Sequence, residues 1–190
     1  PIRLSDHNLR YQPLLELRRS DAARVAKIGS NVVSYHVPKP YIGWNSFRKE
    51  LESAINFISD RFPNLQVKRL GLRYINATDP KVHAIDGIAS LNLQLTINRE
   101  NISSRLNVNF SRFVAGDIGV MTRIASPEFV EGPLPGGTSC FIDVDVFTPK
   151  LPEVRGASDI LAWADRAHAA EKDAFFSLIP TTILDQLREE

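Results

Sequence analysis

The stretch Lys68–Asn76 alternates between apolar and polar side chains, and this alternation constrains the fold more than any other feature of the sequence. Successive side chains of a β-strand leave opposite faces of the sheet, so a period of two predicts a strand with one buried face. The apolar face carries Leu70, Leu72 and Tyr74, and the other face carries Arg69, Gly71 and Arg73. The strand therefore places two fixed positive charges on the face that points away from the core.

Other segments show the same strand character. Residues 91–97 and 102–110 alternate most clearly and flank a polar turn, which predicts an antiparallel hairpin with one apolar and one polar face. Nearer the N-terminus, Gly29-Ser30-Asn31 separates two β-prone runs and predicts a tighter hairpin. The predicted strands are residues 23–28, 32–37, 68–76, 91–97, 102–110, 118–124 and 140–147.

Two segments have helical rather than strand periodicity. Phe47, Leu51, Ile55 and Ile58 recur at spacings of four, four and three, which puts them on one face of a helix. A longer helix is predicted from about residue 159 to 178, where Pro180 ends it. This order of elements predicts an α+β fold in which a curved, mainly antiparallel sheet packs on a long C-terminal helix, a helix-grip-like arrangement. A ferredoxin-like sandwich with extra strands is the alternative.

Length and composition limit the class of protein. A chain of 190 residues with 43% hydrophobic residues suits one domain, residues 1–190, with a core of its own. The single cysteine, Cys140, excludes an internal disulfide and fits a reducing compartment. No run approaches the roughly 18 apolar residues of a membrane helix, so we expect a cytoplasmic protein with no membrane partner. The chain begins at Pro1 without a methionine, which leaves open a natural N-terminal segment before it.

The net charge of +1 conceals a strong asymmetry along the chain. Residues 61–123 hold nine Lys/Arg against four Asp/Glu, whereas residues 124–190 hold five against twelve. Such a division fits internal pairing between the two segments, or a surface divided between two partners. We favour internal pairing because the whole chain is close to neutral.

Five charged residues are expected on the faces of strands that leave the core. They are Arg69, Arg73, Arg105, Asp143 and Asp145. Arginine matches carboxylates and phosphates with two parallel hydrogen bonds, so a shared face could hold an anionic ligand. Alternatively, the aspartates pair with the arginines across neighbouring strands. Two aspartates without a third ligand are a weak metal signal, and we expect no metal site.

A catalytic alternative rests on His168, which lies three residues before Glu171 on the long helix and could act as a general base. Together with Asp143 and Asp145, it would suit a hydrolase or transferase. A half-exposed structural contact is the simpler interpretation of His168. The glycine- and proline-rich loop at residues 132–137 lacks the lysine of a phosphate-binding loop, so we expect no cofactor.

Two motifs carry a resemblance to a known family. The segment Tyr41-Ile-Gly-Trp44 before a helix, and Arg69-Leu-Gly-Leu-Arg-Tyr-Ile-Asn76 after it, give the pattern Y-x-G-W … R-x-G-L-R-Y-x-N. This pattern resembles a sporadically distributed prokaryotic family of uncharacterised function, over about residues 22–190. Family members usually begin with a further strand and helix. The resemblance implies no specific activity, and the patchy distribution suggests mobile or defence-associated gene neighbourhoods.

These observations favour a non-enzymatic binding or accessory protein that acts through a macromolecular partner, most simply another protein. Nucleic acid has weaker support, because Tyr74 and Phe110 are expected to face the core and the last third of the chain is acidic. A small-ligand-binding protein with a cavity between sheet and long helix is the alternative. The candidate binding residues are Arg69, Arg73, Tyr74, Arg105, Asp143, Asp145 and His168.

Overall fold

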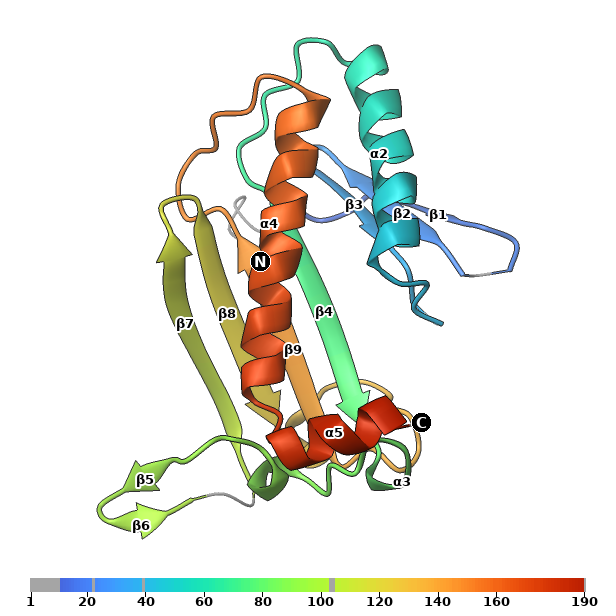
Figure 1. Ribbon diagram of the computed structural model, residues 1–190. Coiled ribbons are helices and arrows are strands. Elements are labelled where there is room, and N and C mark those ends of the chain that lie inside the picture. The colour runs from blue at the N-terminus through green and yellow to red at the C-terminus, as the bar shows by residue number, and fades with distance from the viewer. Residues whose placement is uncertain (1–10, 22, 39, 103–104, 190) are drawn as a thin grey trace, which may run out of the picture. The chain divides into compact units, whose positions relative to one another are not determined.

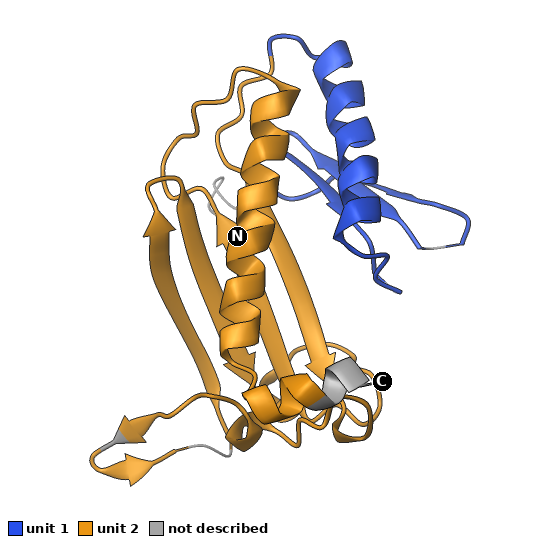
Figure 2. Ribbon diagram, in the orientation of Figure 1, with its two compact units in different colours: residues 1–64 blue, residues 65–190 orange. Residues whose placement is uncertain are grey.

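The computed structural model describes residues 11–21, 23–38, 40–102 and 105–189. The chain forms two compact units, residues 1–64 and residues 65–190 (Figure 2). Each unit has its own sheet, and the two are described one at a time. A single domain over the whole chain stays a prediction.

Unit 1 is a three-stranded antiparallel sheet followed by a helix. The strands are β1 (Leu15–Arg18), β2 (Val25–Gly29) and β3 (Val32–His36), in the order β1-β2-β3. The turn that joins β2 to β3 lies at Ser30 and Asn31, so the predicted hairpin is confirmed. The sequence pattern assigns no element to β1, which extends this hairpin by one short strand.

The helix α2 (Trp44–Arg61) buries Phe47 and Ile55, two members of the predicted apolar face. Polar contacts add to this packing. Arg24 donates to both carboxylate oxygens of Glu50 at 2.5 and 2.8 Å, and the Tyr35 hydroxyl donates to Glu50 at 2.6 Å. The guanidinium of Arg24 lowers the pKa of the Glu50 carboxyl to about 2. Arg24, just before β2, and Tyr35 on β3 therefore both contact α2 through Glu50.

Unit 2 is built on a four-stranded sheet with the order β4-β9-β8-β7 (Figure 1). Its strands are β4 (Gly71–Thr78), β7 (Asn107–Ala115), β8 (Ile118–Ala125) and β9 (Cys140–Phe147), and every neighbouring pair is antiparallel. The strands predicted around residues 68–76, 118–124 and 140–147 are confirmed. The last of them has the predicted bounds.

One face of this sheet is covered by α4 (Ala157–Ser177), which runs along the strands in Figure 1. A short α5 (Thr181–Glu189) follows. Between α4 and the sheet lie deeply buried side chains, which include Val120, Thr122, Ile124, Ile142, Val144, Val146 and Ala167. The α+β class, with a mainly antiparallel sheet packed on a long C-terminal helix, is confirmed. A ferredoxin-like sandwich has the same two layers and is not distinguished from it.

The strand predicted at residues 91–97 is wrong over most of its length. This part of the chain forms α3 (Pro80–His83), the 3-10 turn η1 (Ile88–Ser90), and the two-residue strands β5 (Thr96–Ile97) and β6 (Glu100–Asn101). The amide of Leu91 donates to Ile88, and the amide of Asn92 donates to the carbonyl of Leu178 at 2.7 Å, just beyond α4. The amide of Asn92 is therefore satisfied by the residue after α4 and not by a neighbouring strand.

The second half of the predicted hairpin is displaced as well. The strand β7 begins at Asn107, not near residue 102, and it pairs with β8. Phe110, which was expected to face the core, is partly exposed. Its strand forms the edge of the sheet, whereas α4 packs over β9, β8 and β4.

Candidate functional site

Strand register divides the candidate residues between the two faces of the unit 2 sheet. Tyr74 pairs with Val144 and lies on the face that α4 covers. Arg73 and Asp145 also pair, and each lies one position from Tyr74 or Val144 on its strand. Both side chains therefore lie on the opposite face. Asp143 shares this second face, because it lies two residues before Asp145 on β9.

Arg73 and Asp143 form the strongest ion pair on the second face. Nε and Nη2 of Arg73 donate to the two carboxylate oxygens of Asp143 at 2.8 and 2.5 Å. Asp143 is only 5% exposed, whereas 56% of the Arg73 side chain remains exposed. The carboxylate raises the pKa of Arg73 further, so this guanidinium stays charged. Arg73 thus neutralises a carboxylate that has almost no access to water.

Arg69 and Asp145 form a weaker pair beside it. Nη2 of Arg69 lies 3.4 Å from Asp145, and its guanidinium lies 5.4 Å from the centre of the Phe147 ring. Burial raises the pKa of the Asp145 carboxyl, against the opposing effect of Arg69 and Arg73. The sequence alone left open which aspartate each arginine meets. The structure pairs Arg73 diagonally with Asp143 and leaves Asp145 to Arg69.

Arg105 is not part of this cluster, which corrects the expectation that all five charged residues share one face. It precedes the first residue of β7 and donates to Glu128 at 2.7 Å. Both side chains are largely exposed. Residue 105 is outside the strand and its side chain pairs with Glu128, whereas Arg69, also outside its strand, is placed by its contacts with Asp145 and Phe147.

The charge asymmetry along the chain is explained by internal pairing. Four arginines of the basic segment meet carboxylates of the acidic segment, in the pairs Arg69–Asp145, Arg73–Asp143, Arg105–Glu128 and Arg112–Asp173. All four connect residues that are distant in sequence. The favoured interpretation of the charge division is therefore confirmed for these residues.

The second face also carries exposed apolar side chains. Ile75 on β4 is 59% exposed, Met121 on β8 is 39% exposed, and Phe113 on β7 is 74% exposed. Strand register puts all three on the same side as Asp143 and Asp145. At one end of this face Ala125 and Phe141 are buried. From the rest of this face we single out six residues, which we call the open patch: Arg69, Arg73, Ile75, Phe113, Met121 and Asp145.

On the opposite face, α4 and β4 bring together three titratable side chains, which are Tyr74, His168 and Glu171. The Tyr74 hydroxyl lies 3.4 Å from Nδ1 of His168, and Nδ1 of His168 lies 3.8 Å from a carboxylate oxygen of Glu171. Glu171 is 5% exposed, and burial raises the pKa of its carboxyl to about 7. Burial also lowers the pKa of His168.

His168 therefore does not converge with the two aspartates. The sheet itself separates His168 and Tyr74, on the helix-covered face, from Asp143 and Asp145 on the open patch side. A hydrolase or transferase site that uses His168 with these aspartates has no common reaction centre in this geometry. Cys140 is fully buried, and burial raises the pKa of its thiol to about 11, which makes it a poor nucleophile.

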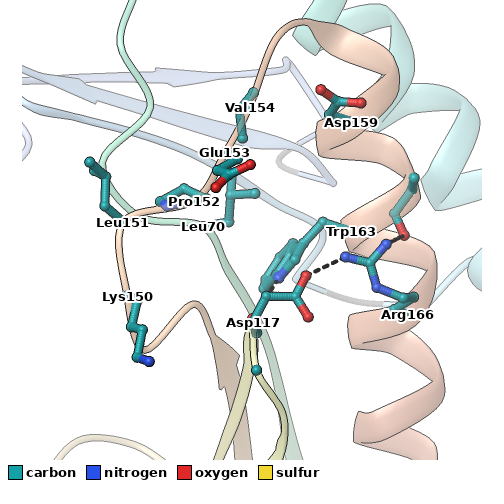
Figure 3. A pocket seen from close by; sticks show the side chains of 12 residues that line it. Leu70, Asp117, Lys150, Leu151, Pro152, Glu153, Val154, Asp159, Trp163 and Arg166 are labelled. Carbon is teal, nitrogen blue, oxygen red and sulfur yellow. Dashed lines mark hydrogen bonds and ion pairs between the residues drawn. The ribbon is translucent and has the colours of Figure 1, made fainter.

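Between sheet and helix, where a ligand cavity was considered, the side chains of Val120, Val144 and Ala167 are buried. A separate pocket of about 380 Å³ lies at one end of unit 2 (Figure 3). Trp163 contributes to its wall and donates from Nε1 to the carbonyl of Asp117 at 3.2 Å, while Arg166 pairs with the Asp117 carboxylate. Its lining residues are Leu70, Gly116, Asp117, Lys150, Leu151, Pro152, Glu153, Val154, Asp159, Ala162, Trp163 and Arg166. None of the candidate binding residues lines it.

Among the described residues, no group of three or more His, Cys, Asp and Glu side chains could hold a metal ion. No described helix is both long and apolar enough to cross a membrane. No protein-family model, curated protein or solved structure matches the chain. The family resemblance of the Y-x-G-W and R-x-G-L-R-Y-x-N motifs accordingly stays a prediction.

Two glycines on the second face should respond differently to alanine. A Cβ at Gly71 would meet nothing closer than 3.8 Å, so Gly71 is not required by close packing, contrary to what a glycine in a strand usually indicates. A Cβ at Gly119 would lie 2.8 Å from the Phe147 ring. We expect Gly71→Ala to change the free energy of unfolding by less than about 0.5 kcal/mol and Gly119→Ala to lower it by about 1–3 kcal/mol. Urea denaturation of both variants measures this, and equal effects would contradict it.

Proposed function

We propose that this chain is a non-enzymatic binding or accessory protein, and that the open patch of unit 2 binds a protein partner. The observation that carries the proposal is the presence of Ile75, Met121 and Phe113 on the sheet face opposite α4. An antiparallel sheet with one face on the core ordinarily presents polar residues on its other face. Exposed apolar side chains grouped there are typical of an interaction surface.

The composition of the open patch supports a protein as the partner. Arginine, methionine and aromatic side chains are enriched at protein–protein interfaces, and the patch contains each of them. Arg73 is held in place by Asp143, so little side-chain freedom is lost when a partner contacts its exposed side. A defence- or mobile-element-associated role rests on the family resemblance alone and is part of the same proposal.

Affinity purification from the organism that encodes the chain tests this proposal with matched variants. Phe113→Asp places a charge on the patch at an exposed position of an edge strand, and Ala169→Asp places the same charge on an exposed position of α4. We expect wild type and Ala169→Asp to retain one stoichiometric protein partner that Phe113→Asp loses. Melting temperatures of the three proteins control for folding. Absence of a stoichiometric partner, or a partner retained equally by all three, contradicts the proposal.

A further inference from the structure

We propose that the partner presents an acidic segment with apolar flanks to the open patch, with its carboxylates bound by Arg69 and Arg73. This inference rests on the proposed function and specifies the chemistry of the partner. It follows from which charged groups of the patch face solvent, from how the two arginines are held, and from the apolar side chains around them.

The exposed charge of the patch is positive, although the cluster also contains two aspartates. The side chains of Arg69 and Arg73 are 61% and 56% exposed, whereas that of Asp145 is 18% exposed. Asp143 is buried more deeply still. A partner that approaches this face therefore meets guanidinium groups first, and the carboxylates act mainly as their supports.

Both guanidinium groups are positioned before a partner arrives. Two of the five N–H donors of Arg73 bond Asp143, and Arg69 lies over Phe147 with one contact to Asp145. The outer donors of such a fixed fork match the two oxygens of a carboxylate. Pre-organised arginines of this kind are favoured as the energetic centres of interfaces.

The spacing of the two arginines fits an extended or helical protein segment. They lie four residues apart in sequence, which spans about 13 Å in an extended chain, and their contacts with Asp143, Asp145 and Phe147 put both on the second face. Gly71 between them adds no side chain. Ile75 lies two residues beyond Arg73 on β4, and Met121 pairs with Asp145 from β8, so both offer exposed apolar surface on the same face. An extended segment with acidic residues four positions apart and an apolar residue midway between them presents all three on one side, so it can satisfy both kinds of group.

The same features disfavour nucleic acid as the occupant. Binding to a phosphate backbone uses several cations along a groove and aromatic rings on which bases stack. Tyr74 lies on the helix-covered face, and Arg73 and Arg69 are each partly neutralised by an aspartate. An oligonucleotide is nevertheless a necessary arm of the test, because arginine also binds phosphate.

Fluorescence anisotropy with three labelled probes tests the inference on the full chain. The probes are a peptide of about twelve residues that repeats Glu-Ser-Val-Ser, the same peptide with lysine in place of glutamate, and a single-stranded RNA of about the same length. We expect the acidic peptide to bind, and its affinity to fall about threefold in Arg69→Gln and about tenfold in Arg69→Glu. Both variants spare the Arg73–Asp143 pair, and their melting temperatures verify folding. Ala169→Asp should leave the affinity unchanged.

Several outcomes overturn the inference. The acidic peptide binding no better than the lysine peptide, or with an affinity that the Arg69 variants do not change, contradicts it. Tighter binding of the RNA assigns the patch to nucleic acid instead. If the peptide fails while a protein partner sensitive to Phe113→Asp is recovered from cells, the acidic chemistry is wrong and the proposed function stands.

Discussion

Replacing Arg73 with alanine should lower the free energy of unfolding by about 2 kcal/mol, the lower end of the range for breaking a buried ion pair from one side. The variant leaves the carboxylate of Asp143, which is 5% exposed, without the guanidinium that neutralises its charge. The lower end applies because more than half of the Arg73 side chain is exposed, which weakens the interaction by solvent screening. Urea denaturation followed by circular dichroism measures the loss.

Arg69→Ala is the matched control for this prediction. Arg69 approaches the same face and also meets an aspartate, but at 3.4 Å and with a largely exposed side chain. We expect its loss to change the free energy of unfolding by less than about 0.5 kcal/mol. A double-mutant cycle should show coupling of Arg73 to Asp143 of at least about 1 kcal/mol, and much less to Asp145. Coupling to Asp143 below about 0.5 kcal/mol would show that Arg73 is effectively solvated.

Replacing Glu171 with glutamine should stabilise the protein at pH 8 by about 2 kcal/mol and have little effect near pH 4.5. Burial raises the pKa of this carboxyl to about 7, above its ordinary value of 4.5. The folded state therefore favours the protonated form, and wild type loses stability as the pH rises from about 4.5 to about 7. Glutamine has the same shape and carries no charge, so it avoids that loss.

The pH dependence distinguishes this effect from a general change in helix stability. The lowered pKa of His168 acts in the opposite direction, because protonation of the ring costs stability as the pH falls. Asp173→Asn on the same helix is the control, since 72% of that side chain is exposed. We expect a difference below about 0.5 kcal/mol for it at every pH. A Glu171→Gln effect that is constant between pH 5 and 8 would show that burial does not shift this carboxyl.

Periodicity predicted segments that pair within a sheet, and it failed at residues 91–95, which belong to none of the described strands. β9 lies between β4 and β8, and its observed bounds, Cys140–Phe147, are those of the alternating segment. Residues 91–97 alternate equally well. Alternation describes the side chains of one segment only, and it does not show whether another strand lies within hydrogen-bonding distance. In this segment the amide of Asn92 donates a hydrogen bond to the carbonyl of Leu178 and not to a neighbouring strand.

The candidate site was predictable in part for the same reason. Alternation along the predicted strands 68–76 and 140–147 placed Arg69, Arg73, Asp143 and Asp145 on a common face. The structure agrees, through strand register for three of them and through its contacts with Asp145 and Phe147 for Arg69. The diagonal pairing of Arg73 with Asp143 depends on strand register, which the sequence does not specify. The same alternation places Ile75 with the arginines, so its exposure was open to prediction. The exposure of Met121 could not be predicted, because its segment is apolar at nearly every position and shows no alternation.

Site-specific photo-crosslinking in the native cells tests most directly whether the open patch binds a protein. A benzoyl-phenylalanine can replace Phe113 on the patch or Phe176 on α4, and both phenylalanines are exposed members of unit 2, at 74% and 44%. We expect irradiation to give one discrete crosslinked protein from position 113 and none from position 176. No product from position 113, or the same product from both positions, would contradict a partner-binding role for the open patch.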